Sequence, residues 1–305
     1  MIRYLASRLL HGVLVVVGVV TIVFLLMHMA GDPTALFLPV GATPEDFVRV
    51  RHQLGLDLPL HMQYFSFMAG ALKGDFGSSI RYSQPSMSLV LERLPATLSL
   101  TGLALGLTVL ASVPLGVVAA VRRNSFWDTF CTGAALAGQS MPSFWLGIVL
   151  ILLFAVHWRI FPSSGGSGFM AVVLPAVTLG AYSMGLATRM VRSAVLEVFR
   201  KDYVRTARAK GLAERVVLSR HVLRNASIPV VTVVGLQLAQ LLGGAIVTEQ
   251  IFGYPGMARL AVQSVMNRDF PVVQAFVVVT AVIVLVVNLL VDLLYAKLDP
   301  RIIYQ

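Results

Sequence analysis

Six long stretches of this chain carry almost no charged side chains, and they limit what it can fold into. They are Leu9–Met29, Pro95–Val121, Thr129–Val156, Phe169–Met190, Ile228–Thr248 and Val272–Val291. About 20 apolar helical residues cross the hydrocarbon core of a bilayer, and each stretch reaches that length. The sequence therefore predicts an all-α integral membrane protein with six transmembrane helices.

The composition agrees with a membrane protein. Apolar residues make up 57% of the chain and charged residues 12%, against about 45–50% and roughly 25% in soluble domains. The net charge of +10 could indicate nucleic-acid binding, but no soluble basic domain is available to carry such a site. Contact with the anionic headgroups of the lipid bilayer explains the charge more simply. The single cysteine, Cys131, excludes a cysteine-rich metal site, and we expect no metal site.

The first apolar stretch could be either a cleaved signal peptide or a retained helix. Arg3 and Arg8 resemble the positively charged start of a signal peptide. The apolar part of a signal peptide is about 7–15 residues long and ends at a small-residue cleavage site. This stretch is longer and no such site follows it, so we expect an N-terminal transmembrane helix over residues 1–29.

The remaining chain divides by composition into three parts. Residues 30–95 are mixed in character and predict a loop region with two short helices, Glu45–Leu54 and His61–Leu72, the first of them capped by Thr43. Residues 96–294 predict a five-helix core that includes the basic loop 195–227. Residues 295–305 form a short tail. Proline within a span is tolerated where neighbouring helices satisfy the freed carbonyls, which indicates a packed bundle.

The distribution of positive charge predicts the orientation in the membrane. Ten of the 24 Lys and Arg residues lie between Arg189 and Arg224, whereas the short loops 157–171 and 249–271 contain one and two. Short loops rich in Lys and Arg stay in the cytoplasm. We therefore expect both termini and the basic loop to be cytoplasmic, and residues 30–95 to lie on the outer side.

The basic loop contains an ordered set of helix signals. Asp202 is a candidate N-cap for a helix Tyr203–Lys210, and Gly211 suits the position after a helix, where a positive φ is needed. A second amphipathic helix, Glu214–Arg224, is expected to lie on the bundle through Val216, Val217, Leu218 and Leu223. This segment could serve only topology and anionic lipid binding. It could also insert a helix into a groove on a cytoplasmic partner, which its ordered signals favour.

The sequence lacks the motifs of several kinds of enzyme and carrier. It contains no G-x-x-x-x-G-K-[ST], no H-E-x-x-H and no G-x-S-x-G pattern. We therefore expect no catalytic residues and no bound nucleotide in this chain. A self-contained secondary carrier would be favoured by inverted repeats and by ionisable residues buried in the spans. Neither is evident, so the energy for any transport should come from another subunit.

Several long motifs occur in a fixed order along nearly the whole chain. They are HMAGDP, LGLDLPL, KGDFGSSI, RLPATLSL, SMPSFWLG, DYVRTARAKGL and EQIFGYPGMARL. In these motifs the chain resembles the permeases of the dipeptide/oligopeptide/nickel family of ABC importers. In the wider superfamily the cytoplasmic loop has the pattern E-A-A-x3-G, and Gly211 aligns with its glycine. Arg205 and Thr206 then stand on the first E-A positions and depart from that pattern.

The resemblance implies a permease subunit of an ATP-driven importer in a bacterial or archaeal inner membrane. It implies a second homologous permease, two cytoplasmic ATPase subunits that hold the ATP and Mg, and an extracytoplasmic binding protein. Short peptides are the implied substrates, and nickel, glutathione, haem and opines remain alternatives. The basic loop would be the coupling helix. The implied ATPase-coupling residues are Asp202, Tyr203, Arg205, Thr206, Ala207, Arg208, Lys210, Gly211 and Glu214.

Three glutamines are candidates for a substrate pathway. Gln237 and Gln240 are three residues apart and share a helix face, and Gln139 precedes Pro142 in the third stretch. A neutral polar pathway would suit varied peptides. Ordinary hydrogen bonding between helices explains these residues equally well.

Overall fold

The computed structural model describes residues 2–29, 34, 38, 41–53, 55–165 and 168–298, and these residues are almost entirely helical. They separate into two compact units. The first unit contains the described residues of 1–96 and 255–286, and the second contains those of 97–254 and 287–298. The boundaries between the units fall within two long helices, after residue 96 in α4 Ser86–Val121 and after residue 286 in α12 Phe270–Leu298.

The first unit consists of the N-terminal helix, the short helices that follow it, and the region after residue 254. Its core contains Phe76, Val90, Met257 and Val272, all buried. The approach of α1 to α12 is close, because a Cβ on Gly12 would overlap Leu285. Its elements are α1 Ile2–Met29, α2 Pro44–Gln53, α3 Leu60–Lys73, the first part of α4 Ser86–Val121, α11 Met257–Met266 and most of α12 Phe270–Leu298.

The predicted cap of α2 is confirmed. The Thr43 hydroxyl lies 3.3 Å from the amide nitrogen of Asp46, and the Asp46 carboxylate accepts hydrogen bonds from both the amide and the hydroxyl of Thr43. This reciprocal pair satisfies amide groups that the first turn of a helix leaves without partners. Helix α11 was not predicted, although Gly256 precedes it and buried residues recur along one face at Met257, Leu260 and Ala261.

The second unit is built around α7, which packs against α5, α6 and α10. Glycine permits this close approach, since a Cβ on Gly185 would lie 2.3 Å from the carbonyl oxygen of Ala135 in α5. Gly116 of α4 meets Val191 of α7 in the same way. The remaining elements are α5 Phe126–Ser140, α6 Ser143–Leu150, η2 Ile151–His157, α7 Phe169–Phe199, α8 Asp202–Ala209, α9 Glu214–Val216, η3 Val217–Leu223 and α10 Arg224–Ile251.

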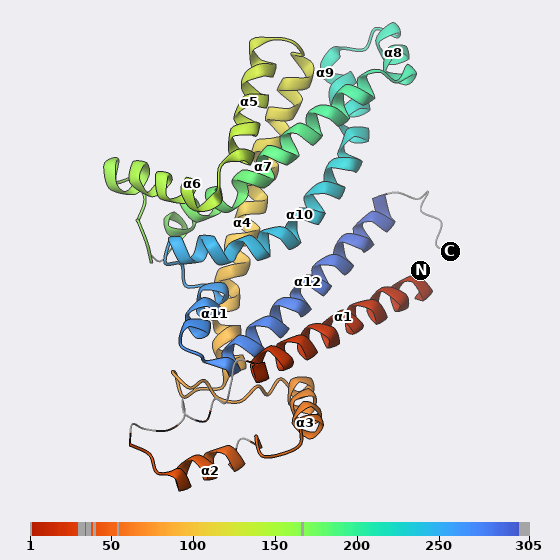
Figure 1. Cartoon of the computed structure of the whole chain (residues 1–305). Helices are drawn as coiled ribbons and strands as arrows, with labels where there is room; N and C mark the ends of the chain where they lie inside the picture. Colours follow the sequence, from red (N-terminus) through yellow and green to blue (C-terminus); the bar gives the residue numbers. More distant parts are fainter. Residues whose placement is uncertain are drawn as a thin grey trace. The chain divides into compact units, whose positions relative to one another are not determined.

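The third predicted span is wrong as a straight helix. The chain bends by 107° between α5 and α6, and Figure 1 shows α6 leaving the bundle at this bend. Pro142 has no amide hydrogen to donate and disfavours helical backbone in the preceding residue. Met141 accordingly has extended backbone, with φ −79° and ψ 130°.

The predicted all-helical membrane fold is confirmed, while the count of six spans stays a prediction. Among the described residues, four helices are long and apolar enough to cross a bilayer, namely α4, α7, α10 and α12. The bent pair α5 and α6–η2 would be a fifth. Helix α1 contributes a shorter apolar part, Leu10–Leu26.

Candidate functional site

The basic loop folds into a compact structure between α7 and α10, which we call the coupling segment, residues Lys201–Arg224. Figure 1 shows it, with α8 and α9, at the end of the unit where α7 stops and α10 begins. The predicted N-cap is wrong by one residue. Lys201 occupies that position with extended backbone and no side-chain capping hydrogen bond, and Asp202 is the first residue of α8. Its exposed carboxylate still lies at the positive end of the helix dipole.

The end of α8 follows the prediction for Gly211. This glycine has a φ of +75°. Its amide donates to the carbonyl of Arg208 at 2.9 Å, and the amide of Leu212 donates to the carbonyl of Ala207 at 3.4 Å. These two bonds make a Schellman motif, in which a left-handed residue closes the helix. Gly211 therefore fixes the direction in which the chain leaves α8.

An ion pair crosses this turn. The guanidinium of Arg208 donates two hydrogen bonds to the carboxylate of Glu214 and lies over the Phe199 ring, 5.3 Å from its centroid. The pair lowers the pKa of Glu214 and raises the pKa of Arg208, chiefly through these hydrogen bonds. Both side chains are therefore paired with each other, and this ion pair links α8 to α9.

One face of α8 is fixed to the bundle by apolar packing. Val204 is fully buried and Ala207 is 5% exposed, and both belong to a core cluster with Val195 of α7 and Val217 and Val222 that follow α9. Because the Ala207 side chain packs inside its own unit, it offers little surface to a partner subunit, and its coupling role stays a prediction. Its contribution is to hold α8 in place.

The opposite face of the coupling segment is exposed. Tyr203, Leu212 and Val216 are each about two-fifths exposed, although this segment lies outside the candidate spans. Val216 was expected to be buried, so that part of the prediction is wrong. The other exposed residues that were predicted to couple to an ATPase are polar or charged, and they are Asp202, Arg205, Thr206, Arg208, Lys210 and Glu214. Apolar side chains among polar ones are typical of a protein interface.

The predicted second helix does not end at Arg224. Helix α9 runs through the π-helical turn η3 directly into α10. The coupling segment is thus continuous with a helix that extends to Ile251. Arg220 and Arg224 lie at exposed positions along this continuous helical stretch.

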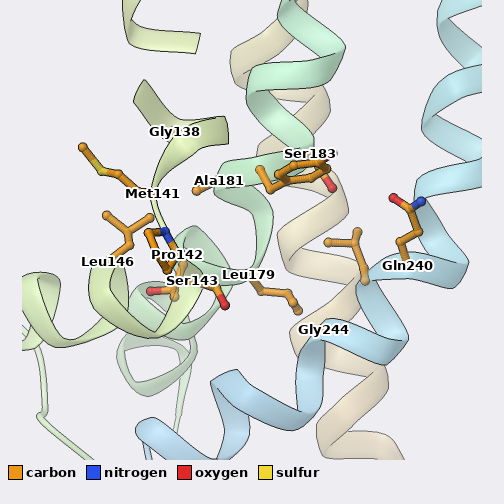
Figure 2. A pocket seen from close by; sticks show the side chains of 13 residues that line it. Gly138, Met141, Pro142, Ser143, Leu146, Leu179, Ala181, Ser183, Gln240 and Gly244 are labelled. Atoms are coloured by element: carbon orange, nitrogen blue, oxygen red, sulfur yellow. The ribbon is translucent and has the colours of Figure 1, made fainter. Parts of the chain in front are cut away.

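A pocket of about 330 Å³ lies in the same unit, beside the bend between α5 and α6. Figure 2 shows Gln240 of α10 on one side and Met141 and Pro142 on the other. None of the thirteen residues that line it is charged. Its polar groups come from Ser143, Thr178, Tyr182, Ser183 and Gln240.

The structure brings only one of the three predicted glutamines to this pocket. Gln240 lines it. Gln139 instead accepts a hydrogen bond of 3.0 Å from Arg189. Gln237 is 2% exposed, and neither atom of its amide group has a hydrogen-bond partner among the described residues. Such a buried amide costs free energy, about 1–3 kcal/mol.

Comparison with known proteins identifies the family. A family model described as "Binding-protein-dependent transport system inner membrane component" matches residues 112–304, and the N-terminal model of the same kind matches residues 1–101. The chain belongs to this family. It is thus a membrane permease of the ABC importer type that its motifs resemble, and a multi-pass inner-membrane protein.

Similar permeases match over the full length. The dipeptide transport system permease protein DppB of Escherichia coli K12 is 39% identical over 335 residues, covering 99% of each chain. A putative peptide transport system permease of Brucella abortus is 41% identical over 314 residues, covering all of both chains. The glutathione transport system permease protein GsiC of Salmonella paratyphi A is 41% identical over 306 residues, again covering all of both.

Solved structures share the fold at low sequence identity. The methionine ABC transporter MetNI in an inward-facing conformation has a TM-score of 0.61 and 19% identity, covering 70% of this permease and 97% of that chain. An amino acid ABC transporter with histidines has a TM-score of 0.52 and 18% identity, covering 69% and 94%. These likenesses confirm the permease fold.

One buried ion pair of the permease was missed in the sequence. Arg192 of α7 donates two hydrogen bonds, of 2.7 and 2.8 Å, to the carboxylate of Asp128 at the start of α5. Asp128 is only 6% exposed. Its place at the end of an apolar stretch made it look like a boundary residue. Among the residues that the structure describes, no three His, Cys, Asp or Glu side chains gather as a metal site would require.

Proposed function

We propose that this permease moves short peptides into the cytoplasm as one membrane subunit of an ATP-driven importer. Its partners are a second homologous permease, two cytoplasmic ATPase subunits that bind the ATP and Mg, and an extracytoplasmic binding protein. Hydrolysis takes place on the ATPases and not on this chain. Both termini and the coupling segment face the cytoplasm. The peptide substrate is supported by the names of the three full-length relatives, which act on dipeptides, peptides and glutathione.

The observation that carries this proposal is the continuity between the coupling segment and the pocket. Helix α7 lines the pocket with five residues between Thr178 and Ser183, and it ends at Phe199, just before α8. Helix α10 continues from the coupling segment and lines the same pocket with Gln240, Leu241 and Gly244. A displacement of α8 by an ATPase is therefore passed along two helices to the pocket. Tightly packed elements move as units because their interiors are close-packed.

The pocket suits peptides of varied sequence. Its lining is uncharged, and its hydroxyl and amide groups can pair with the peptide backbone, which is common to all peptides. A pocket that no His, Cys, Asp or Glu side chain lines does not favour nickel. Specificity among peptides then belongs to the binding protein that delivers them.

Co-purification from the native membrane tests the partners. In this experiment the tagged permease should bring down proteins with P-loop motifs. The double variant Tyr203→Asp, Leu212→Asp should lose at least nine-tenths of them, because it places two charges in the proposed contact. Leu72→Asp is the matched control, since Leu72 is 86% exposed and belongs to α3 of the first unit, outside the coupling segment. Recovery of ATPases by the double variant at the wild-type level would contradict the role of this surface.

Peptide uptake tests the pathway. Replacing both Gln237 and Gln240 by leucine should lower uptake while the ATPases remain bound. Gln139→Leu is the comparison, since the structure pairs Gln139 with Arg189. Unchanged uptake in the double variant would remove both glutamines from the pathway.

A further inference from the structure

The turn Ser78–Pro85, which we call the outer turn, is stabilised by many hydrogen bonds although it is largely exposed. It lies between α3 and α4 in the first unit and closes through an isolated β-bridge between Ser78 and Pro85. The amide of Ser79 donates to the carbonyl of Gln84 at 2.8 Å, and the amide of Ser83 donates to the carbonyl of Ser79 at 3.0 Å. At its base, Ser86 donates from both its amide and its hydroxyl to the carbonyl of Gly77.

A buried carboxylate from a distant part of the sequence accepts hydrogen bonds from this turn. Asp269, between α11 and α12, is 1% exposed. It accepts hydrogen bonds from the hydroxyl of Ser79 and from the amides of Ile80 and Arg81, at 3.2 and 3.4 Å for the two amides. The Ser79 hydroxyl accepts in turn from the amide of Tyr82. Hydrogen bonds to an ionised carboxylate are the stronger kind, so the backbone of residues 79–82 has one defined conformation.

Two residues, one within the outer turn and one next to Asp269 in the chain, adopt a backbone conformation that side chains disfavour. Ser83 has a φ of +51° and Arg268 a φ of +54°. The left-handed conformation is sterically unfavourable for a residue with a side chain. Strain of this kind collects where a surface must hold one particular shape. Glycine would be more favourable at either position if shape were all that mattered.

The side chains displayed here are those that protein interfaces use. Arg81 is exposed and lies over the Tyr82 ring, 5.8 Å from its centroid, and Tyr82 is itself 36% exposed. Near Asp269 along the chain, Arg268 is exposed and Met266 is 80% exposed. Tyrosine and arginine dominate the binding energy of protein interfaces, and a rigid backbone reduces the entropy lost on binding. Both exposed charges adjoining this carboxylate are positive.

We infer that the outer turn, together with Met266 and Arg268, is the surface that receives the extracytoplasmic binding protein. The proposal rests on the proposed function, which places residues 30–95 outside the membrane. The fitting partner is a soluble protein that presents carboxylates to Arg81 and Arg268 and an apolar position to Tyr82 and Met266. Anionic lipid headgroups would also attract the arginines, but lipid binding needs no fixed backbone. The hydrogen-bonded, strained turn therefore favours a protein.

Binding-protein affinity of the whole transporter tests this inference. The complex is reconstituted in nanodiscs with its ATPases, and the binding protein encoded with it is titrated against it at two salt concentrations. Arg81→Glu, Arg268→Glu should weaken binding at least tenfold and abolish its weakening by salt, with basal ATPase activity unchanged. Arg49→Glu, on the exposed surface of α2, is the matched control and should stay within twofold. Arg81→Ala keeps the backbone amide that Asp269 binds and should weaken binding in the same direction.

The outcomes separate this inference from the proposed function. Wild-type affinity in both Arg81→Glu, Arg268→Glu and Arg81→Ala would overturn the docking surface while leaving the importer intact. The same holds if these variants lose only their affinity for vesicles of anionic lipid, which would make the turn a lipid site. Failure of the wild-type complex to bind ATPases or any binding protein would overturn the proposed function itself. Restored affinity on reversing a carboxylate of the binding protein would identify its partner for Arg81.

Discussion

Two helices in this permease end with the same backbone geometry, but they use different types of residue at the left-handed position. At the end of α8 the left-handed position is Gly211, and at the end of α11 it is Arg268. In both, the amide of the left-handed residue donates to the second-last carbonyl of the helix, and the amide of the following residue donates to the third-last carbonyl. Glycine adopts this conformation without steric cost, whereas arginine does not.

The residues that follow these ends explain how each is held. After Gly211 the chain is joined by the exposed pair Arg208–Glu214, which contributes little because solvent screens it. After Arg268 comes Asp269, a buried carboxylate with three donors. The second end can therefore tolerate a strained residue, because stronger bonds beside it offset the strain. A glycine at such a position contributes only its backbone conformation. An arginine there has a steric cost, which indicates that its side chain has a role.

The largest effect is expected from removing the buried carboxylate. Asp269→Ala should reduce the stability of the first unit by about 3 kcal/mol, because three donors lose their acceptor and part of them stays buried. The check is the thermal unfolding midpoint in detergent, together with hydrogen exchange at residues 79–82. Asp75→Ala is the control, since Asp75 is exposed and accepts one hydrogen bond, from Gly77. Equal effects of the two substitutions would contradict the importance of burial.

At the glycine end the expected effect is smaller. Gly211→Ala should destabilise the coupling segment by about 1 kcal/mol, because alanine disfavours a φ of +75°. Limited proteolysis between α8 and α9 measures this opening. Gly243→Ala makes the same change within α10, where a Cβ would meet no atom within 4 Å, and should not increase cleavage. Resistance of Gly211→Ala equal to the wild type would show that the turn does not need its glycine.

The arginine end should respond in the opposite direction. Arg268→Gly removes the steric cost of a φ of +54° and should raise stability by up to about 1 kcal/mol, offset in part by the freedom that glycine gains when unfolded. The same variant should bind the binding protein more weakly. A thermal shift assay and the nanodisc titration measure the two quantities. If the variant is less stable than the wild type and binds the binding protein equally well, Arg268 is neither strained nor used in binding.

The smallest effect concerns pH. The Arg208 guanidinium lowers the pKa of Glu214 below its usual value of 4.5, so the folded state favours the charged carboxylate. The resulting stability is fully present above pH 4.5 and is lost as the pH falls through the lower, folded pKa. For a pair this exposed it is under about 1 kcal/mol. The unfolding midpoint of Glu214→Gln should lie below that of the wild type at pH 7, and the gap should close in acid. A gap independent of pH would assign the effect to packing.

Local signals in the sequence predicted several of these features correctly. The uncharged stretches located α1, α4, α7, α10 and α12, because the length of an apolar helix is set by the bilayer and not by other residues. Gly211 was located for a similar reason, since a helix end with positive φ is a local requirement. The motifs gave the family, which full-length relatives confirmed.

Other features depended on residues far apart in the chain. The bend at Pro142 had a visible cause, but its direction depends on what α6 can pack against. Two hydrogen-bonded pairs join residues that are 64 and 190 positions apart, Asp128–Arg192 and Ser79–Asp269. No local sequence pattern predicts partners at such distances. Likewise, the two glutamines Gln237 and Gln240 share a helix face in the sequence, yet only Gln240 reaches the pocket.

The sequence by itself predicted a helical membrane protein with a structured basic segment, and its motifs indicated an ABC importer permease. Hydropathy, charge distribution and helix-end residues depend on a few neighbouring positions, so they can be recognised in the sequence itself. Only the tertiary structure decided that Ala207 faces inward, that the coupling segment continues into α10, and that Asp269 holds the outer turn. Burial and hydrogen bonding of a side chain depend on which distant elements lie against it, and that is fixed only when the chain has packed.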